Sequence, residues 1–187
     1  MSDNRIERID PDQLNLHIER VVHTNKVSKT HKGGRTMSWQ VMVVVGDGKG
    51  HVGCGIGKAL GVPDAIRKAI EAARKNLVKV PIVGSSIPHE VSVKVGATRI
   101  VMRPASPGTG VVAGSTVRAL LEAAGIHDVL AKLVGSRNSI NAAWATMECF
   151  REIRWPEQTA DLRNMKLSKL APWYVKKYLD VEEAKHA

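Results

Sequence analysis

The chain has 187 residues, a formal net charge of +10 at pH 7 and a sequence pI of about 9.9. Its length accommodates one large domain or two small ones with a modest core each, and we expect two. The charge favours a phosphate-rich partner, nucleic acid above all. No apolar run approaches the ~18 residues of a membrane span and the first residues are polar and acidic, so we expect a cytoplasmic protein with no membrane partner.

The two cysteines, Cys54 and Cys149, lie far apart in the sequence, and neither belongs to a pattern of zinc ligands. This argues against both a disulfide framework and a zinc site, and it suits a reducing cytosol. We therefore expect no metal and no cofactor.

Most of the positive charge falls in residues 21–80, which carry eleven Lys/Arg and three Asp/Glu. After a polar tail over residues 1–13, the partly alternating run from Leu14 to Lys29 predicts a strand that leads into a basic loop. The sequence KGGR at residues 32–35 predicts a turn, because paired glycines reach positive φ without steric cost and let a phosphate approach the backbone. Such clustering favours a binding surface, although a solvated charged face has the same composition.

The β-branched run from Met37 to Val45 predicts a second strand, which ends at the glycine turn GDGKG over residues 46–50. The next strand, His51 to Lys58, has glycine at every second position, so we expect another backbone or a ligand to approach its bare face. Pro63 and Asp64 open a helix that is expected to reach about Val78. We expect a sheet with this helix on its apolar face and cations on the other side or in the loops, an α+β unit over residues 14–80.

Residues 81–88 (PIVGSSIP) have the composition of a linker, and we place the domain boundary there. A second α+β unit with the order β-β-α-β-α is expected over residues 89–154. Its expected elements are strands at His89–Val95, Thr98–Met102 and Asp128–Val134 and helices at Thr116–Ala124, ended by Gly125, and about Ile140–Phe150, capped by Asn138 or Ser139. Residues 155–187 are expected to form a partly helical extension that docks on a neighbour through scattered apolar side chains, among them Trp173, Tyr174 and Tyr178.

Three enzyme motifs are present only in fragments. The glycines at 48, 50 and 53 match the dinucleotide pattern but lie between two expected strands, whereas that fingerprint needs a helix that starts inside it. Gly57-Lys58 lacks the remaining residues of a phosphate loop, and His89-Glu90 lacks the second histidine of a metalloprotease helix. We therefore expect no catalytic residues.

Structured RNA is the favoured nucleic acid. With 4% aromatic residues the chain lacks the stacking platforms of sequence-specific single-strand binders, and Trp39, on an alternating strand, is expected in a core or an interface. Lysine, arginine, glycine loops and helix ends read phosphates and 2′-hydroxyls through shape.

Two long segments support a more specific interpretation. They read VSKTHKGGRTMSWQVMVVVGDGKGHVGCGIGKALGVPDAIRKAIEAARKNL and RIVMRPASPGTGVVAGSTVRALLEAAGIHDVLAKLVGSRNSIN. In order and separation they resemble the bacterial small-subunit ribosomal protein five family, over roughly residues 14–155. The resemblance implies an N-terminal domain like double-stranded-RNA-binding modules and a C-terminal domain of the ribosomal protein five domain-two-like type. This chain departs from many members of that family at Cys54, Leu60 and Gly61 and in the tail after Arg154.

The resemblance also implies a role: a structural component of the small ribosomal subunit that binds its rRNA, supports assembly and contributes to decoding accuracy near the mRNA entry path. The implied protein partners are small-subunit proteins four and eight. The implied rRNA-binding residues are Lys26, Ser28, Lys29, Thr30, Lys32, Gly33, Gly34, Arg35, Lys49, Lys58, Arg67, Lys68, Arg74, Lys75, Arg137 and Asn138. The implied protein-facing residues are Arg103, Pro104, Ser106, Gly108, Thr109, Gly110 and Arg118.

Two alternatives stay open at this point. An RNA-dependent enzyme or chaperone would need an acid, base or metal-ligand set in the second unit, where the acids Glu90, Glu122, Asp128 and Glu148 are isolated along the sequence. A free-standing binder of double-stranded RNA would sediment away from ribosomes.

Overall fold

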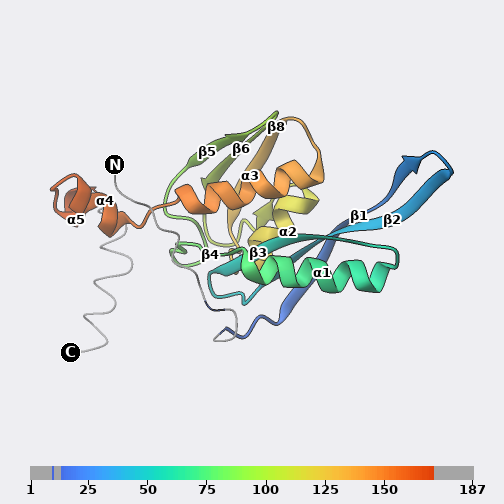
Figure 1. Ribbon diagram of the computed structural model, residues 1–187. Helices are drawn as coiled ribbons and strands as arrows, with labels where there is room; N and C mark the ends of the chain where they lie inside the picture. The colour runs from blue at the N-terminus through green and yellow to red at the C-terminus, as the bar shows by residue number, and fades with distance from the viewer. Residues whose placement is uncertain (1–9, 11–13, 171–187) are drawn as a thin grey trace.

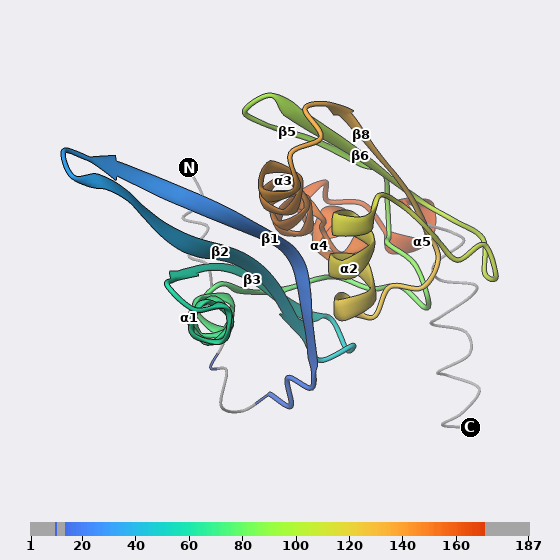
Figure 2. The ribbon, with the colours of Figure 1, turned by 90° about the vertical axis from the view of Figure 1, so that its right-hand side faces the viewer.

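A computed structural model of the chain describes residue 10 and residues 14–170, and it has four layers (Figure 1). Across the molecule these are one helix, a first sheet, a pair of helices and a second sheet, and Figure 2 shows the same order from the side. The predicted α+β class with two units is confirmed. The packing of these layers determines which loops stay exposed and available to a partner.

The first sheet is antiparallel, with strand order β1-β2-β3-β4. Its strands are β1 (Ile18–His31), β2 (Gly34–Gly46), β3 (His51–Ala59) and β4 (Leu77–Lys79). The β1–β2 register shifts between Val21 and His23, and such a bulge bends and twists a strand. The hairpin is longer than the sequence predicts, because β1 continues to His31 and pairs there with Gly34.

Helix α1 (Val62–Lys75) starts beside Pro63, as predicted, but ends three residues earlier than the expected Val78. Leu77 and Val78 form β4 instead, paired with Gly53 and Val52 of β3, and both are buried. Two consecutive buried apolar residues suit a short strand covered on both faces, and three residues are too few to show a period in the sequence.

The bare face of β3 lies against the backbone of α1, which confirms that another backbone approaches these glycines. A Cβ on Gly53, Gly55 or Gly57 would fall inside contact distance of α1 backbone atoms. The helix residues that face these glycines are small: Ala65, Ala69 and Ala73 are all fully buried between α1 and β3. Helix and strand therefore pack through their main chains, and larger side chains have no room there.

The second sheet has the strand order β5-β6-β8-β7. Its strands are β5 (Val91–Val95), β6 (Thr98–Pro104), β7 (Val111–Val112) and β8 (Val129–Gly135), and its helices are α2 (Ser115–Ala124) and α3 (Ser139–Glu152). Gly125 ends α2 with a φ of +87°, and the Asn138 side chain accepts a hydrogen bond from the Ile140 amide, so both predicted caps are confirmed. The two-residue strand β7, parallel to β8, was not foreseen.

The two units share one hydrophobic core, which corrects the expectation of a separate core for each. Met42, Val44 and Cys54 of the first sheet belong to the same buried cluster as Leu120 and Phe150 of helices α2 and α3. The first sheet is thus covered on both faces, by α1 on one and by α2 and α3 on the other (Figure 2). Its cations consequently lie in the projecting end of the β1–β2 hairpin, in loops, near strand ends and on the outer side of α1.

The connecting segment 81–88 is folded into this core, since Val83 and Ile87 are 5% and 2% exposed. After α3 the chain forms two short helices, α4 (Pro156–Leu162) and α5 (Leu167–Leu170), so the extension is partly helical as predicted. Trp173, Tyr174 and Tyr178, which the sequence assigns to a docking extension, lie outside the described residues.

Candidate nucleic-acid interface

The β1–β2 hairpin projects beyond both sheets (Figures 1 and 2). We call residues 26–37 the finger; from residue 28 to residue 37 every one is exposed. At its tip a Cβ on Gly33 would meet nothing within 4 Å, while Gly34 has a φ of +139° that favours glycine. Gly34 therefore serves the turn, whereas packing alone does not require a glycine at residue 33.

The pairing register divides the finger's cations between its two faces. Lys26 is opposite Trp39, and Arg35 is opposite Thr30, which puts Lys26 and Arg35 on one face. Lys29, opposite Thr36, lies on the other face, and Lys32 is in the turn. The Lys26 ammonium lies 5.9 Å from the centroid of the Trp39 ring, within the range of a cation–π contact. Trp39 itself packs beside the α1 core cluster, as the sequence predicts.

Among the described residues, no acidic side chain forms an ion pair with these cations. The sequence also has no Asp or Glu between Glu19 and Asp47. A projecting, unneutralised cluster of Lys and Arg creates a positive potential that attracts phosphate. Ser28 and Thr30 add exposed hydroxyls to the face that carries Lys26 and Arg35.

A second group of predicted residues lies at the root of the finger. Of the predicted residues, Lys58, Arg67 and Lys68 line one shallow hollow, together with Ser38 and the 74%-exposed Leu60. Arg67 is held by Asp64 at 2.5 Å, whereas Lys68 has no ion pair among the described residues. The structure thus brings the start of α1 next to the finger. Farther along α1, Arg74 is 3.6 Å from Glu19 and Lys75 is exposed in the last turn.

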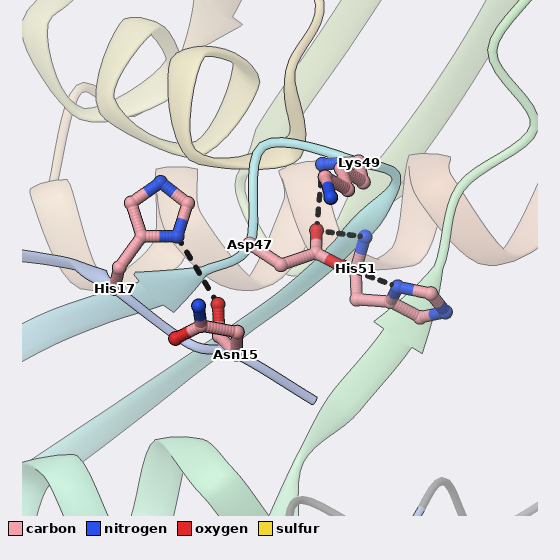
Figure 3. Close-up of polar contacts among 5 residues, drawn as sticks. All are labelled: Asn15, His17, Asp47, Lys49 and His51. Carbon is pink, nitrogen blue, oxygen red and sulfur yellow. Dashed lines mark hydrogen bonds and ion pairs between the residues drawn. The ribbon is translucent and has the colours of Figure 1, made fainter. Parts of the chain in front are cut away.

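Lys49 is not brought together with the finger. It lies in the turn at the opposite end of β2, about 40 Å from the tip if each of the strand's thirteen residues rises ~3.3 Å. In that turn the Asp47 carboxylate accepts hydrogen bonds from the amides of Lys49 (2.7 Å) and His51 (3.0 Å), and Oδ2 lies 2.6 Å from His51 Nδ1 (Figure 3). Burial raises the pKa of the Asp47 carboxyl, but these hydrogen bonds outweigh burial and hold the pKa below its usual value.

The same turn caps a helix of the other unit. The amides of Gly48 and Gly50 donate to the carbonyls of Ala123 (3.1 Å) and Ala124 (2.9 Å), the last residues of α2. Helix ends leave such carbonyls without intrahelical partners, so the turn satisfies them across the shared core. The glycines that resemble a dinucleotide motif therefore serve the contact between the two units.

The glycine-rich loop 104–114 is exposed but tied down. The buried Asp128 accepts a hydrogen bond from the Gly110 amide (2.9 Å), and Thr109 Oγ1 donates to the Ser106 carbonyl (2.7 Å). A hydrogen bond from Ser85 and the one from Gly110 lower the pKa of the Asp128 carboxyl. Gly108 and Gly110 have φ values of +89° and +77°, so the loop needs glycine for its shape.

The remaining predicted residues flank this loop and the start of α3. Arg103 pairs with Glu90 at 3.0 Å, next to Pro104 at the end of β6, and Arg118 donates to the Val111 carbonyl at 3.1 Å. Arg137 is exposed, whereas the Asn138 side-chain oxygen is already used as the cap of α3. The predicted residues thus form two main regions, the finger with its root and the loop region. Lys49 belongs to neither, and Arg137 and Asn138 lie at the other end of β8 from the loop, because Gly135 pairs with Thr98 whereas Val129 pairs with Pro104.

The described residues hold no group of three or more His, Cys, Asp or Glu placed to bind a metal ion. Cys54 and Cys149 are buried thiols whose pKa burial raises to about 12, so neither is a reactive nucleophile at neutral pH. None of the helices in the described part of the chain is long and apolar enough to cross a membrane.

Comparison with known families decides between the alternatives. Residues 17–81 match the family described as ribosomal protein S5, N-terminal domain, and residues 93–163 match ribosomal protein S5, C-terminal domain. The chain belongs to the ribosomal protein S5 family. The resemblance inferred from the sequence is therefore confirmed, and a ribosomal structural protein of the cytoplasm, not an enzyme, is the kind of protein that this family contains.

Three S5 relatives, each named small ribosomal subunit protein uS5, are similar to this chain over most of their length. The protein of Chloroflexus aurantiacus is 54% identical over 159 residues, which cover 85% of this chain and 89% of the relative. That of Fusobacterium nucleatum is 52% identical over 82% of this chain and 93% of the relative. That of Syntrophobacter fumaroxidans is 49% identical over 87% and 97%, respectively.

Sequence reasoning on this S5 chain missed the two carboxylates that organise its loops, Asp47 and Asp128. Each is buried and accepts hydrogen bonds from loop amides. The signal for Asp47 was present, since Asp followed by Gly-Lys-Gly is typical of a turn in which the carboxylate bonds to amides a few residues on. Asp128 lies 18 residues from its partner Gly110, and no local pattern indicates that pairing.

Proposed function

We propose that the chain is a component of the small ribosomal subunit that binds small-subunit rRNA through the finger and the start of α1, and thereby supports subunit assembly. The observation that carries this proposal is the finger itself. It is a projecting hairpin with four cations, Lys26, Lys29, Lys32 and Arg35, and no ion pair to any described residue. Phosphate groups are the natural complement of such a surface.

The division of cations between two faces specifies how the finger would bind. A hairpin with Lys29 on one face and Lys26 and Arg35 on the other cannot present all three to one flat surface. It fits between two RNA segments, with each face toward the phosphates of one segment and Lys32 at the leading end. Gly33, which has open space around it, allows the backbone to come close to ribose and phosphate.

We further propose that the loop region, from Arg103 to Arg118, faces small-subunit proteins four and eight near the mRNA entry path and so contributes to decoding accuracy. In support, the loop is exposed at Ser106 and Thr109 yet anchored by Asp128, which is the arrangement of a preformed contact surface. We also keep the division into domains at residues 14–80 and 89–154, with the boundary at 81–88, as part of this proposal.

Replacing Lys29, Lys32 and Arg35 together by alanine tests the finger. We expect the affinity for small-subunit rRNA to fall about 10- to 100-fold, because three solvent-exposed ionic contacts of roughly 0.5 to 1 kcal/mol each are lost. The slope of log affinity against log salt should flatten by about 2 to 3, since each phosphate contact contributes roughly 0.9 on duplex DNA. Both quantities come from titrations of the full chain against rRNA over a series of salt concentrations.

The matched control removes the same charge elsewhere, through Lys79→Ala, Arg163→Ala and Lys166→Ala, three exposed positions outside the finger and α1. This variant should keep most of the slope. If the finger variant has the slope of the unchanged chain, the finger is not the phosphate-binding surface and the proposal fails.

A further inference from the structure

The second sheet has one covered face and one open face. Helices α2 and α3 pack on the inner face, where Val91, Ile100 and Met102 are buried. On the opposite side the ribbon of β5, β6 and β8 lies at the edge of the molecule, with no described helix over it (Figures 1 and 2). We call this side the outer face; its outward residues are Ser92, Lys94, Arg99, Val101, Arg103, Val112, Leu130, Lys132 and Val134.

The pairing register arranges the charges of the outer face in a band across three strands. Lys94 on β5 is directly opposite Arg99 on β6, and Lys132 on β8 is opposite Val101, the next outward residue of β6. Like charges in directly opposed positions destabilise a sheet. Of the ion pairs among the described residues, none includes Lys94, Arg99 or Lys132. The band therefore lacks an anionic complement within the described chain.

Aliphatic side chains lie directly beside this band. Val112, Leu130 and Val134 are 52%, 40% and 53% exposed, and they make up three of the eight large hydrophobic residues exposed in the described chain. Val112 is opposite Leu130, and Val134 is opposite Arg99, so the aliphatic residues alternate with the cations on adjoining strands. Apolar side chains gathered on one open sheet face, with charges around them, mark an interaction surface.

We propose that the outer face docks a protein whose contact surface places acidic side chains around an apolar centre. Charge complementarity with Lys94, Arg99 and Lys132 requires the acids, and the aliphatic row requires an apolar counterpart, which proteins supply and phosphate backbones do not. Single-stranded nucleic acid fits less well, because the outer face presents no aromatic side chain on which a base could stack. The centre of this docking face, at Lys94, Arg99 and Lys132, lies outside the finger and the loop region, and only its edge at Arg103 and Val112 adjoins the loop region. Docking at this centre goes beyond the contacts proposed above.

Lys94→Glu separates docking from stability. A glutamate at position 94 would pair with Arg99 across the strands, so the like-charge pair becomes an opposite-charge pair and the free chain should melt about 1 to 4 °C higher. The same change removes the Lys94 cation that would face the partner, and the new ion pair also occupies Arg99. We therefore expect docking to fall at least about tenfold while stability rises, a combination that damage to the fold does not produce.

Docking is measured by a photocrosslinker placed at Ser92, on the outer face, in the full chain incorporated into small ribosomal subunits. The expected product contains a second protein, resists ribonuclease, and maps to a partner segment with Asp or Glu beside apolar residues. Its yield per incorporated chain should fall with Lys94→Glu and also with Leu130→Ser, but not with Lys79→Glu, a matched charge change on β4. A probe at the exposed Gln158 controls for chance proximity.

Each other outcome overturns the proposal. A ribonuclease-sensitive product whose yield is unchanged by Leu130→Ser would show that the partner is RNA. A crosslink to this chain's own residues, or no product beyond that at Gln158, would exclude an outside protein. Because yield is counted per incorporated chain, a failure of the finger proposal leaves this result unaffected.

Discussion

Two glycine turns lie at opposite ends of β2, and they differ in every property except composition. The turn at residues 32–35 is exposed, carries Lys32 and Arg35 and touches nothing around Gly33. The turn at residues 46–50 is enclosed, because Gly48 and Gly50 donate to the end of α2 and Asp47 organises the loop from inside. Similar sequence patterns therefore serve a binding tip in one place and a joint between layers in the other.

The largest effect is expected from a substitution that disrupts the enclosed turn. A Cβ on Gly125 would fall within contact distance of the Gly48 carbonyl, and the residue has a φ of +87° that alanine adopts at a cost. We expect Gly125→Ala to lower the free energy of unfolding by about 3 kcal/mol or more. Urea denaturation of the full chain measures this; a loss below 1 kcal/mol, on the order of an average substitution, would show that the joint yields easily.

A smaller effect is expected from Asp47→Asn, which keeps the shape of the side chain but removes its charge. Loss of the charge-assisted bonds to the amides of Lys49 and His51 should cost about 1 to 3 kcal/mol at neutral pH. The pKa of Asp47 is lowered in the folded chain, so its contribution is complete above the unfolded value of about 3.9 and is lost as the pH falls through the folded value.

The difference between the unchanged chain and Asp47→Asn should therefore shrink as the pH falls from 5 toward 2. Urea denaturation repeated at several pH values tests this sign. A difference that stays constant over that range would mean that the Asp47 charge does not hold the turn, and Asp161→Asn, at an exposed position on α4, serves as the control.

The smallest effect is expected from a substitution in the exposed turn at residues 32–35. Gly33→Ala meets no atom within 4 Å, so the free energy of unfolding should change by less than about 0.5 kcal/mol. If RNA approaches the backbone at the tip, the added methyl group should still weaken rRNA binding measurably. Unfolding and rRNA titrations on the same preparation separate the two, and a large loss of stability would contradict an open tip.

The regular elements could be predicted from the sequence because periodicity, caps and turn residues are local signals, and the family could be predicted from the resemblance of two long segments. Residue type alone predicted the cap at Gly125, a cap of α3 at Asn138 or Ser139, and a close approach of a backbone or a ligand at Gly53, Gly55 and Gly57. The shared core was not predicted. Its signal was the unbroken apolar run from Val41 to Val45, which is typical of a strand buried on both faces rather than one.

The arrangement of the candidate site could be predicted less well. The cations of the finger were identified, but their division between two faces depends on the pairing register, which the position of the turn decides. Lys49 is among the rRNA-binding residues that the resemblance implies, although β2 carries it to the far end of the sheet from the finger. The outer face of the second sheet is visible only once β5, β6 and β8 are placed side by side.

The strand β2 belongs to two environments without a break. Its second half is clamped between α1 and the pair α2 and α3, and its first half is one edge of the finger. Because β2 is continuous, the finger has no hinge between its free tip and the packed half of the strand. A force applied at the tip is therefore transmitted to the helices on both faces of the sheet, and the finger can change direction only if β2 bends or the whole molecule tilts.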